Sequence, residues 1–180
     1  MGSFIVTLVG PDRPGLVSTL AGQVACHGGS WLESRMARLA GQFAGIVRIE
    51  LPDEAAVATI RFALDGLREE GFGVLLQEAA TPPTTVAGDL HATLSLIGQD
   101  RPGIVRDLTR ILAAHRVNIE ELTTNVESAS FSGEEMFRAE ARLRIPAPLG
   151  LAQIRTALEG LGNEFMVDVQ AGAAAESQAA

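Results

Sequence analysis

Two short segments of the sequence combine residue types that could bind a small charged molecule. Each reads Gly-x-Asp-Arg-Pro-Gly, at residues 10–15 and again at residues 98–103. Both follow a short apolar run that predicts a strand, and both precede a helical pattern. The last glycine of each segment removes a Cβ, so a ligand can approach the backbone. Pro14 and Pro102 are predicted to lie in the first helical turn, where an amide proton has no partner within the helix.

The chemistry expected of such a loop is recognition of an α-amino acid. A helix N-terminus presents free N–H groups and the positive end of the helix dipole, which suits a carboxylate. Asp12 and Asp100 add a carboxylate that could hold an ammonium group by a charge-assisted hydrogen bond. The predicted ligand-binding residues of the two loops are Asp12, Arg13, Pro14, Gly15 and Leu16, and Asp100, Arg101, Pro102, Gly103 and Ile104.

A purely structural interpretation of the same loops stays open. The aspartate could cap the helix, the arginine could be a solvated partner of a nearby acid, and the glycine could allow close strand–helix packing. The occurrence of the whole turn twice favours binding in at least one copy.

The two loops belong to an internal repeat. Gly10, Asp12 and Gly15 each precede their counterparts by 88 residues, and the apolar positions 16, 20 and 24 match 104, 108 and 112. Pro52 matches Pro146 at an offset of 94, so the second copy contains six extra residues, expected in a longer hairpin loop at about residues 129–134.

Each copy predicts the element order β-α-β-β-α-β. Strands are expected at 4–9, 31–39, 43–51 and 72–76, with helices at 14–27 and 53–70; the second copy predicts strands at 92–97, 119–127, 135–145 and 165–169, with helices at 102–115 and 149–161. This order predicts an α+β fold of two tandem ferredoxin-like domains, each an antiparallel sheet with two helices on one face. The expected boundaries are 1–79 and 91–170 for the domains, 80–90 for a linker and 171–180 for a disordered tail. Modules of this size with one bare sheet face tend to pair, so we expect association either within one chain or between two chains as a homodimer.

Composition excludes several classes of function. A net charge of −8 argues against direct nucleic-acid binding, and no apolar run approaches the length of a membrane-spanning helix. The single cysteine, Cys26, suits a reducing cytoplasm and is expected in buried packing. His27, His91 and His115 lack neighbours at metal-ligand spacing, and no nucleophile or phosphate-binding motif is present, so we expect no metal, no cofactor and no enzymatic activity. His27 and His115 fall at equivalent predicted helix ends, where capping is expected.

The motif together with the element order resembles the ACT family of amino-acid-sensing domains. The resemblance covers residues 4–77 and 91–170, and residues 32–43 are also similar to the glycine cleavage system transcriptional repressor family. That resemblance implies a protein that binds a transcriptional activator and responds to glycine or a related amino acid. It also implies a ligand site between two modules, formed by the motif loop of one and the start of the second strand of another, where Asn118 and Ile119 match the family. The first copy departs at these positions, with Ser30 and Trp31.

Two matters are left open by the residues alone. Trp31 could close or reshape the first site, or it could anchor the core or a pairing interface. Two rival functions are a free-standing ACT regulator of a metabolic enzyme, and a formyltetrahydrofolate deformylase, which begins with a similar module but needs a catalytic domain downstream. The second copy is the better candidate for amino-acid binding because it keeps both the loop and the Asn-Ile pair.

Overall fold

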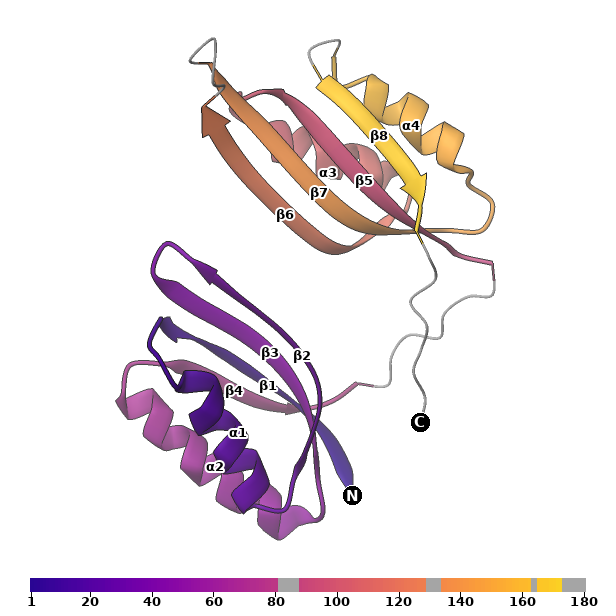
Figure 1. Ribbon diagram of the computed structural model, residues 1–180. Helices are drawn as coiled ribbons and strands as arrows, with labels where there is room; N and C mark the ends of the chain where they lie inside the picture. Colours follow the sequence, from indigo (N-terminus) through magenta and orange to yellow (C-terminus); the bar gives the residue numbers. More distant parts are fainter. Residues whose placement is uncertain (81–87, 129–133, 163–164, 173–180) are drawn as a thin grey trace. The chain divides into compact units, whose positions relative to one another are not determined.

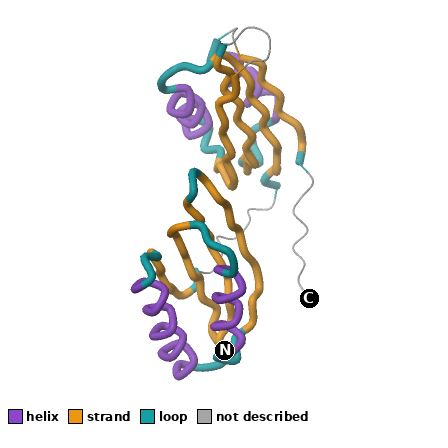
Figure 2. The backbone as a smooth tube through the Cα atoms, turned by 60° about the vertical axis from the view of Figure 1, so that its left-hand side comes forward, coloured by secondary structure: helices purple, strands orange, loops and turns teal. Residues whose placement is uncertain are grey.

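The computed structural model describes residues 1–80, 88–128, 134–162 and 165–172. The chain divides into two compact units, Met1–Pro82 (unit 1) and Pro83–Ala180 (unit 2). Both have the predicted α+β ferredoxin-like architecture, with the helices of each unit on one face of its own sheet (Figure 1). Figure 2 shows the same layering in a view turned by 60°.

The predicted element order is confirmed in both units. Unit 1 comprises β1 (Gly2–Pro11), α1 (Leu16–Cys26), β2 (Ser30–Leu39), β3 (Gln42–Leu51), α2 (Glu54–Glu69) and β4 (Gly73–Glu78). Unit 2 comprises β5 (Leu90–Gln99), α3 (Ile104–Ala114), β6 (Asn118–Ser128), β7 (Glu135–Ile145), α4 (Leu151–Glu159) and β8 (Phe165–Ala171). The sheet orders are β2-β3-β1-β4 and β6-β7-β5-β8, and all neighbouring strands are antiparallel.

Hydrophobic periodicity accounts for the packing of these elements. Alternate residues of β3 and β7 are buried, so each strand turns one face to the helices and the other to solvent. The buried positions of α1 and α3 lie four residues apart, at Leu16, Leu20 and Val24 and at their repeats. Val17, adjacent to this stripe, remains exposed. Helix α2 begins where the carboxylate of Asp53 accepts a hydrogen bond of 2.8 Å from the amide of Ala56.

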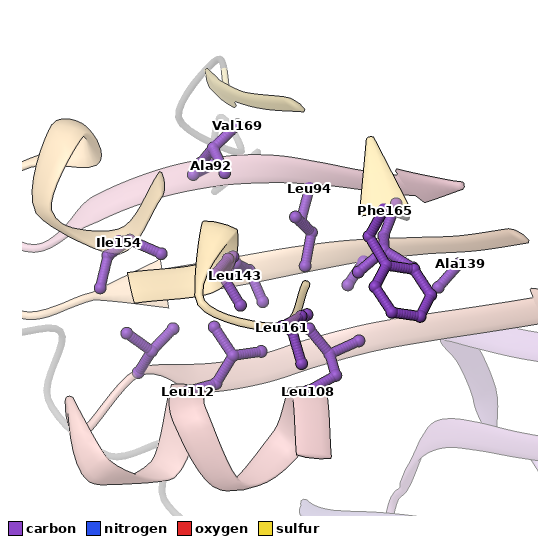
Figure 3. Close-up of a cluster of buried hydrophobic side chains, with 14 of the residues drawn as sticks. Ala92, Leu94, Leu108, Leu112, Ala139, Leu143, Ile154, Leu161, Phe165 and Val169 are labelled. Atoms are coloured by element: carbon purple, nitrogen blue, oxygen red, sulfur yellow. The ribbon is translucent and has the colours of Figure 1, made fainter. Parts of the chain in front are cut away.

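The core of unit 2 illustrates how the layers meet. Leu108 and Leu112 project from α3 toward Leu94 and Leu143 on the sheet, while Phe165 lies toward the Ala139 end of the cluster (Figure 3). Seventeen buried hydrophobic residues form this cluster, and sixteen form its counterpart in unit 1, so each unit has a core of its own.

The strand ladders confirm the repeat and locate its insertion. Trp31 pairs with Ile49 and Ile119 pairs with Leu143, and the same register shift follows in both units. Strands β2 and β3 are joined by Ala40 and Gly41, both with positive φ, as in a two-residue type I′ hairpin. The corresponding ladder of unit 2, between β6 and β7, has one more residue pair than that of unit 1. Residues 129–134 connect these two strands, and residues 129–133 lie outside the described residues.

Several predicted boundaries require correction. The first helix of each unit begins at Leu16 or Ile104, two residues later than expected, because a left-handed glycine precedes it. The predicted tail begins too early, since Ala171 belongs to β8 and the amide of Gly172 donates a 2.8 Å hydrogen bond to the carbonyl of His91. Leu90, placed in the expected linker, is the first residue of β5. Residues 81–87 of that linker and 173–180 of the tail lie outside the described residues.

Candidate functional site

The Gly-x-Asp-Arg-Pro-Gly loops have the same backbone geometry in both units. Gly15 and Gly103 are the N-cap residues of α1 and α3, with φ of 85° and 86°. This left-handed conformation strongly favours glycine, so the glycine is needed for the turn itself as well as for access to the backbone. The predicted position of Pro14 and Pro102 within the first helical turn is wrong, because each proline precedes the cap. Neither helix has a side-chain cap, which rules out Asp12 and Asp100 as capping residues.

The arginine of each loop lies over an aromatic ring, and in unit 1 the first glycine of the loop also packs against that ring. A Cβ on Gly10 would lie 2.2 Å from the ring of Phe72, so only glycine allows this ring to pack against β1. The guanidinium of Arg13 lies over the same ring, 5.1 Å from its centre. In unit 2, Arg101 lies 5.3 Å from the ring centre of Phe165. The arginine therefore holds each loop against the start of the last strand of its own unit, because Phe72 directly precedes β4 and Phe165 is the first residue of β8.

The loop arginine pairs with a different acidic residue in each unit. Arg13 forms an ion pair with Glu70 after α2. Arg101 instead pairs at 3.0 Å with Asp107, which lies in the first turn of α3 and also pairs at 3.0 Å with Arg106. The hydrogen bonds from Arg101 and then Arg106 hold the pKa of Asp107 below its ordinary value of 3.8. Arg13 and Arg101, predicted as ligand-binding residues, thus have partners within the protein.

The two loop aspartates differ in their availability to a ligand. The amide of Asp12 donates to the carbonyl of Gly41 at 3.0 Å, and its carboxylate lies 3.4 Å from the guanidinium of Arg38. The amide of Asp100 donates to the carbonyl of Glu135 at 2.9 Å. Among the described residues, the carboxylate of Asp100 has neither an ion pair nor a hydrogen bond. It is therefore able to accept a hydrogen bond from an ammonium group.

The other predicted loop residues contribute backbone rather than side chains. Leu16 and Ile104 are buried in the two cores, so their side chains cannot meet a ligand. The amide of Ile104 donates to the carbonyl of Arg101 at 3.4 Å. Pro14 and Pro102 are exposed, and a Cβ on Gly15 would have no atom within 4 Å. The space above Gly15 is open. Gly103 is partly covered, because a guanidinium nitrogen of Arg106 would lie 3.1 Å from such a Cβ.

Asn118 and Ile119 do not join the loop of their own unit. Asn118 pairs with Arg144, which pairs with His91 at the start of β5, whereas the loop follows Gln99 at its end. Eight residue steps of extended strand separate His91 from Gln99, a distance of about 26 Å at 3.3 Å per residue. One unit alone therefore cannot bring both halves of the predicted site to one ligand.

Trp31 occupies the position of Ile119 in the ladder of unit 1. Its side chain is half-buried and packs against the core of that unit, as Ile119 does in unit 2. The structure therefore supports the interpretation of Trp31 as a core residue at the edge of the sheet.

The histidines and the cysteine lie apart from the two loops. His27 and His115 are the C-cap residues of α1 and α3, and their Nδ1 atoms lie 2.7 and 2.9 Å from the carbonyls of Gln23 and Ile111. Cys26 is exposed, so its predicted burial is wrong. Within residues 1–80, 88–128, 134–162 and 165–172, no three His, Cys, Asp or Glu side chains gather as metal ligands, and no helix is long and apolar enough to cross a membrane.

Comparison with known proteins identifies the repeated unit. One ACT-domain profile matches residues 3–74 and a second matches residues 92–163, and together they span most of the chain. The chain belongs to the ACT-domain family. Its two units are tandem ACT domains, as the loop motif and the element order predicted.

Two relatives show how far the similarity extends along the chain. The glycine cleavage system transcriptional repressor of Escherichia coli is 24% identical over 162 residues, covering 89% of this chain and 84% of the relative. A UPF0237 protein of Methanopyrus kandleri is 32% identical over 79 residues, which is 44% of this chain and 82% of that protein. These relationships support a regulatory, amino-acid-sensing role.

Solved structures confirm the fold. A protein of unknown function from Galdieria sulphuraria is 29% identical, with a TM-score of 0.81 over 96% of this chain and 99% of that one. A protein provisionally described as a glycine cleavage system transcriptional repressor is 15% identical, with a TM-score of 0.67 over 95% and 98% of the two chains.

Proposed function

We propose that this protein is a non-catalytic regulator that binds glycine or a similarly small amino acid at the loop of unit 2. The observation that carries the proposal is the carboxylate of Asp100, which is unpaired among the described residues and adjoins the N-terminus of α3. Asp100 would hold the ammonium group of the ligand. The amide of Gly103 and the positive end of the α3 dipole would hold its carboxylate.

The charges around this loop support recognition of both ends of the ligand. Arg101 and Arg106 bring two guanidinium groups to the first turn of α3, where both pair with Asp107. A ligand carboxylate would meet the positive end of the helix dipole at this point. In unit 1, Arg38 already lies beside Asp12, so we propose that its loop binds an amino acid more weakly.

The second half of the site would come from another ACT module. Asn118 and Ile119 lie at the far end of the sheet from their own loop, as the ladder of unit 2 requires. We propose that the start of β6 from one module faces the loop of another. Val17 and Val105, exposed at equivalent positions directly after the loops, offer apolar surface for that contact.

The regulatory output we propose is repression through a transcriptional activator protein. Support comes from the relative in Escherichia coli, whose name assigns it repression of the glycine cleavage system and which aligns over most of both chains. The net charge of −8 favours a protein partner over direct contact with DNA. We expect no shift of promoter DNA in a gel with this protein alone.

Calorimetric titration with single amino acids tests the binding proposal. At least one small amino acid should bind, and Asp100→Ala should weaken that binding by about 1.5–3 kcal/mol because a charged hydrogen bond is lost. Asp12→Ala is the matched control at the same position of unit 1, and it should have a smaller effect.

Two results would overturn this assignment. Absence of heat and of thermal stabilisation with all twenty amino acids would exclude the sensor function. Unchanged affinity in Asp100→Ala would exclude its role as the ammonium partner. Affinity capture from the source cell then tests the output: recovery of a transcriptional activator supports repression, whereas recovery of a metabolic enzyme would assign the protein to enzyme regulation.

A further inference from the structure

The second helix of each unit, α2 or α4, has an outer surface on the side of the sheet that carries the helices, here called the helical side (Figure 1). The buried residues of the two helices match at an offset of 94, as Ile60 and Ile154 show, so Phe62 matches Thr156. Phe62 is 81% exposed. The exposed residues around it on α2 are small, namely Ala55, Ala58 and Gly66. Unit 1 therefore presents a projecting aromatic ring where unit 2 has a short side chain.

Around Thr156, unit 2 has an open hollow between α4 and the end of α3. Its volume is about 590 Å³, and its lining residues are His115, Leu149, Ala152, Gln153, Thr156 and Ala157. The imidazole of His115 forms one wall and is held by its 2.9 Å contact with the carbonyl of Ile111. A cavity of about 150 Å³ already accommodates benzene, so the hollow can receive a phenyl ring and part of the helix that carries it.

The helical sides of the two units carry opposite net charge. Residues 53–70, which comprise α2 and its caps, contain five acidic residues and two arginines, and α1 contains no charged residue. Residues 104–116, which comprise α3 and the two residues after it, contain three arginines and one aspartate, and α4 contains one charge of each sign. The helical side of unit 1 is therefore attracted to that of unit 2 and repelled by another copy of itself.

Unpaired charges lie close to the ring and to the hollow. Arg110 and Arg116, five residues before and one residue after His115, have no ion pair within the part of the chain that the structure describes. The matching residues of unit 1, at the offset of 88, are both glycine. Glu69 lies two turns after Phe62 on the same side of α2, and among the described residues it also has no ion pair. An acid beside the ring thus complements the arginines beside the hollow.

We infer that Phe62 of one copy of this chain inserts into the hollow of unit 2 in a second copy. Its ring packs there against Leu149 and the imidazole of His115, which suits an aromatic contact. The same approach brings Glu69 toward the arginines beside the hollow. Pairing of like surfaces is unfavourable, because two hollows leave each other unfilled and two α2 surfaces bring their acids together. The inference concerns assembly alone and does not depend on the proposed amino-acid binding.

The repeat itself supplies the first test variant. Phe62→Thr gives unit 1 the residue that unit 2 carries at the matching position, and the exposure of Phe62 means that the core is unaffected. In sedimentation velocity, the unaltered chain should associate beyond its monomer mass of 18.9 kDa. Phe62→Thr should raise the dissociation constant of this association by roughly 30-fold, as expected when an aromatic anchor is removed from an interface. Its circular dichroism should not change.

A second variant fills the hollow and allows the two halves of the contact to be recombined. Ala152 is exposed on α4, so Ala152→Arg adds bulk and positive charge to the hollow without disturbing the core. Each variant alone should lose the association. A mixture of the two should recover it, because the Phe62→Thr chain keeps an intact hollow and the Ala152→Arg chain keeps Phe62.

Leu39→Thr is the matched control. Leu39 is 80% exposed at the end of β2 in the same unit, so this variant loses a similar apolar surface away from α2 and should associate like the unaltered chain. Three results would each overturn the inference. These are an unaltered chain that remains monomeric at about 100 µM, a concentration that suits a small interface, equal association of the unaltered chain and Phe62→Thr, and a mixture of the two variants that does not recover the association.

Discussion

Unit 1 and unit 2 have the same fold, the same loop backbone and the same arginine–phenylalanine contact, yet they differ in the residues they present to solvent. On the sheet face turned away from the helices, unit 1 carries Ile46 and Leu75 where unit 2 carries Glu140 and Asp168 at the same ladder positions. The aspartate of the unit 1 loop has an arginine beside it, whereas that of unit 2 is unpaired among the described residues. Duplication thus preserved the interactions that support each loop and allowed the surfaces around it to diverge.

The largest effect is expected from removing the ring beneath each loop. Phe72→Ala and Phe165→Ala should each destabilise their own unit by about 3–5 kcal/mol, because a buried ring and its arginine contact are lost. Trp31, the single tryptophan, reports the urea unfolding of unit 1 by fluorescence, and amide exchange in α3 reports unit 2. If only one of the two substitutions destabilises its unit, the arginine–phenylalanine contact does not contribute equally to the stability of both units.

A smaller effect is expected from the left-handed glycines. Gly15→Ala and Gly103→Ala should each cost about 1–2 kcal/mol, because a Cβ is strained at these positive φ values. Gly22→Ala is the matched control within α1, where a Cβ would meet no atom within 4 Å. There the change should stabilise by about 0.5–1 kcal/mol. Equal effects at residues 15 and 22 would refute the conformational explanation of the motif glycine.

The smallest effect is expected from Asp107→Asn, whose influence on stability should depend on pH. The pKa of Asp107 is lowered by its arginine partners, so its ionised form stabilises the folded state above the ordinary value of 3.8. This contribution is lost as pH falls through the lower folded-state pKa. The difference in unfolding midpoint between wild type and Asp107→Asn should therefore be present at pH 7 and shrink below pH 4.

Thr19 holds the matching position of unit 1 and is not acidic. Thr19→Asn should shift the unfolding midpoint by an amount independent of pH. A difference for Asp107→Asn that stays constant between pH 3 and pH 7 would show that its ion pairs contribute nothing to stability.

Most of the fold followed from patterns that operate over a few residues. Alternation along β3 and β7, the apolar stripe of α1 and the constant offset of the repeat all reflect local geometry, so the element order was predicted correctly. The predicted start of the first helix was wrong because the backbone conformation of a single residue determines where that helix begins. The left-handed cap of Gly15 excludes Pro14 from the helix, although proline in a first helical turn was a reasonable expectation from sequence.

The site was predictable only in part, because its roles depend on partners distant in sequence. Nothing local indicates that Arg13 lies over Phe72, nearly sixty residues later, although the matched phenylalanines of the repeat were a usable signal. Asp107 was also missed, even though an acid in the first turn of a helix is a recognisable feature.

By itself, the sequence determined that this protein is a tandem repeat of an α+β module in which each copy has the same Gly-x-Asp-Arg-Pro-Gly loop. Those properties depend on residue type and spacing, which the chain displays directly. Only the tertiary structure decided that the motif arginines brace the loops, that Asp100 is unpaired among the described residues, and that Asn118 lies at the opposite end of its sheet. Each of these depends on which distant side chains the strand ladders bring together, and pairing across a sheet is set by the packing of the whole unit.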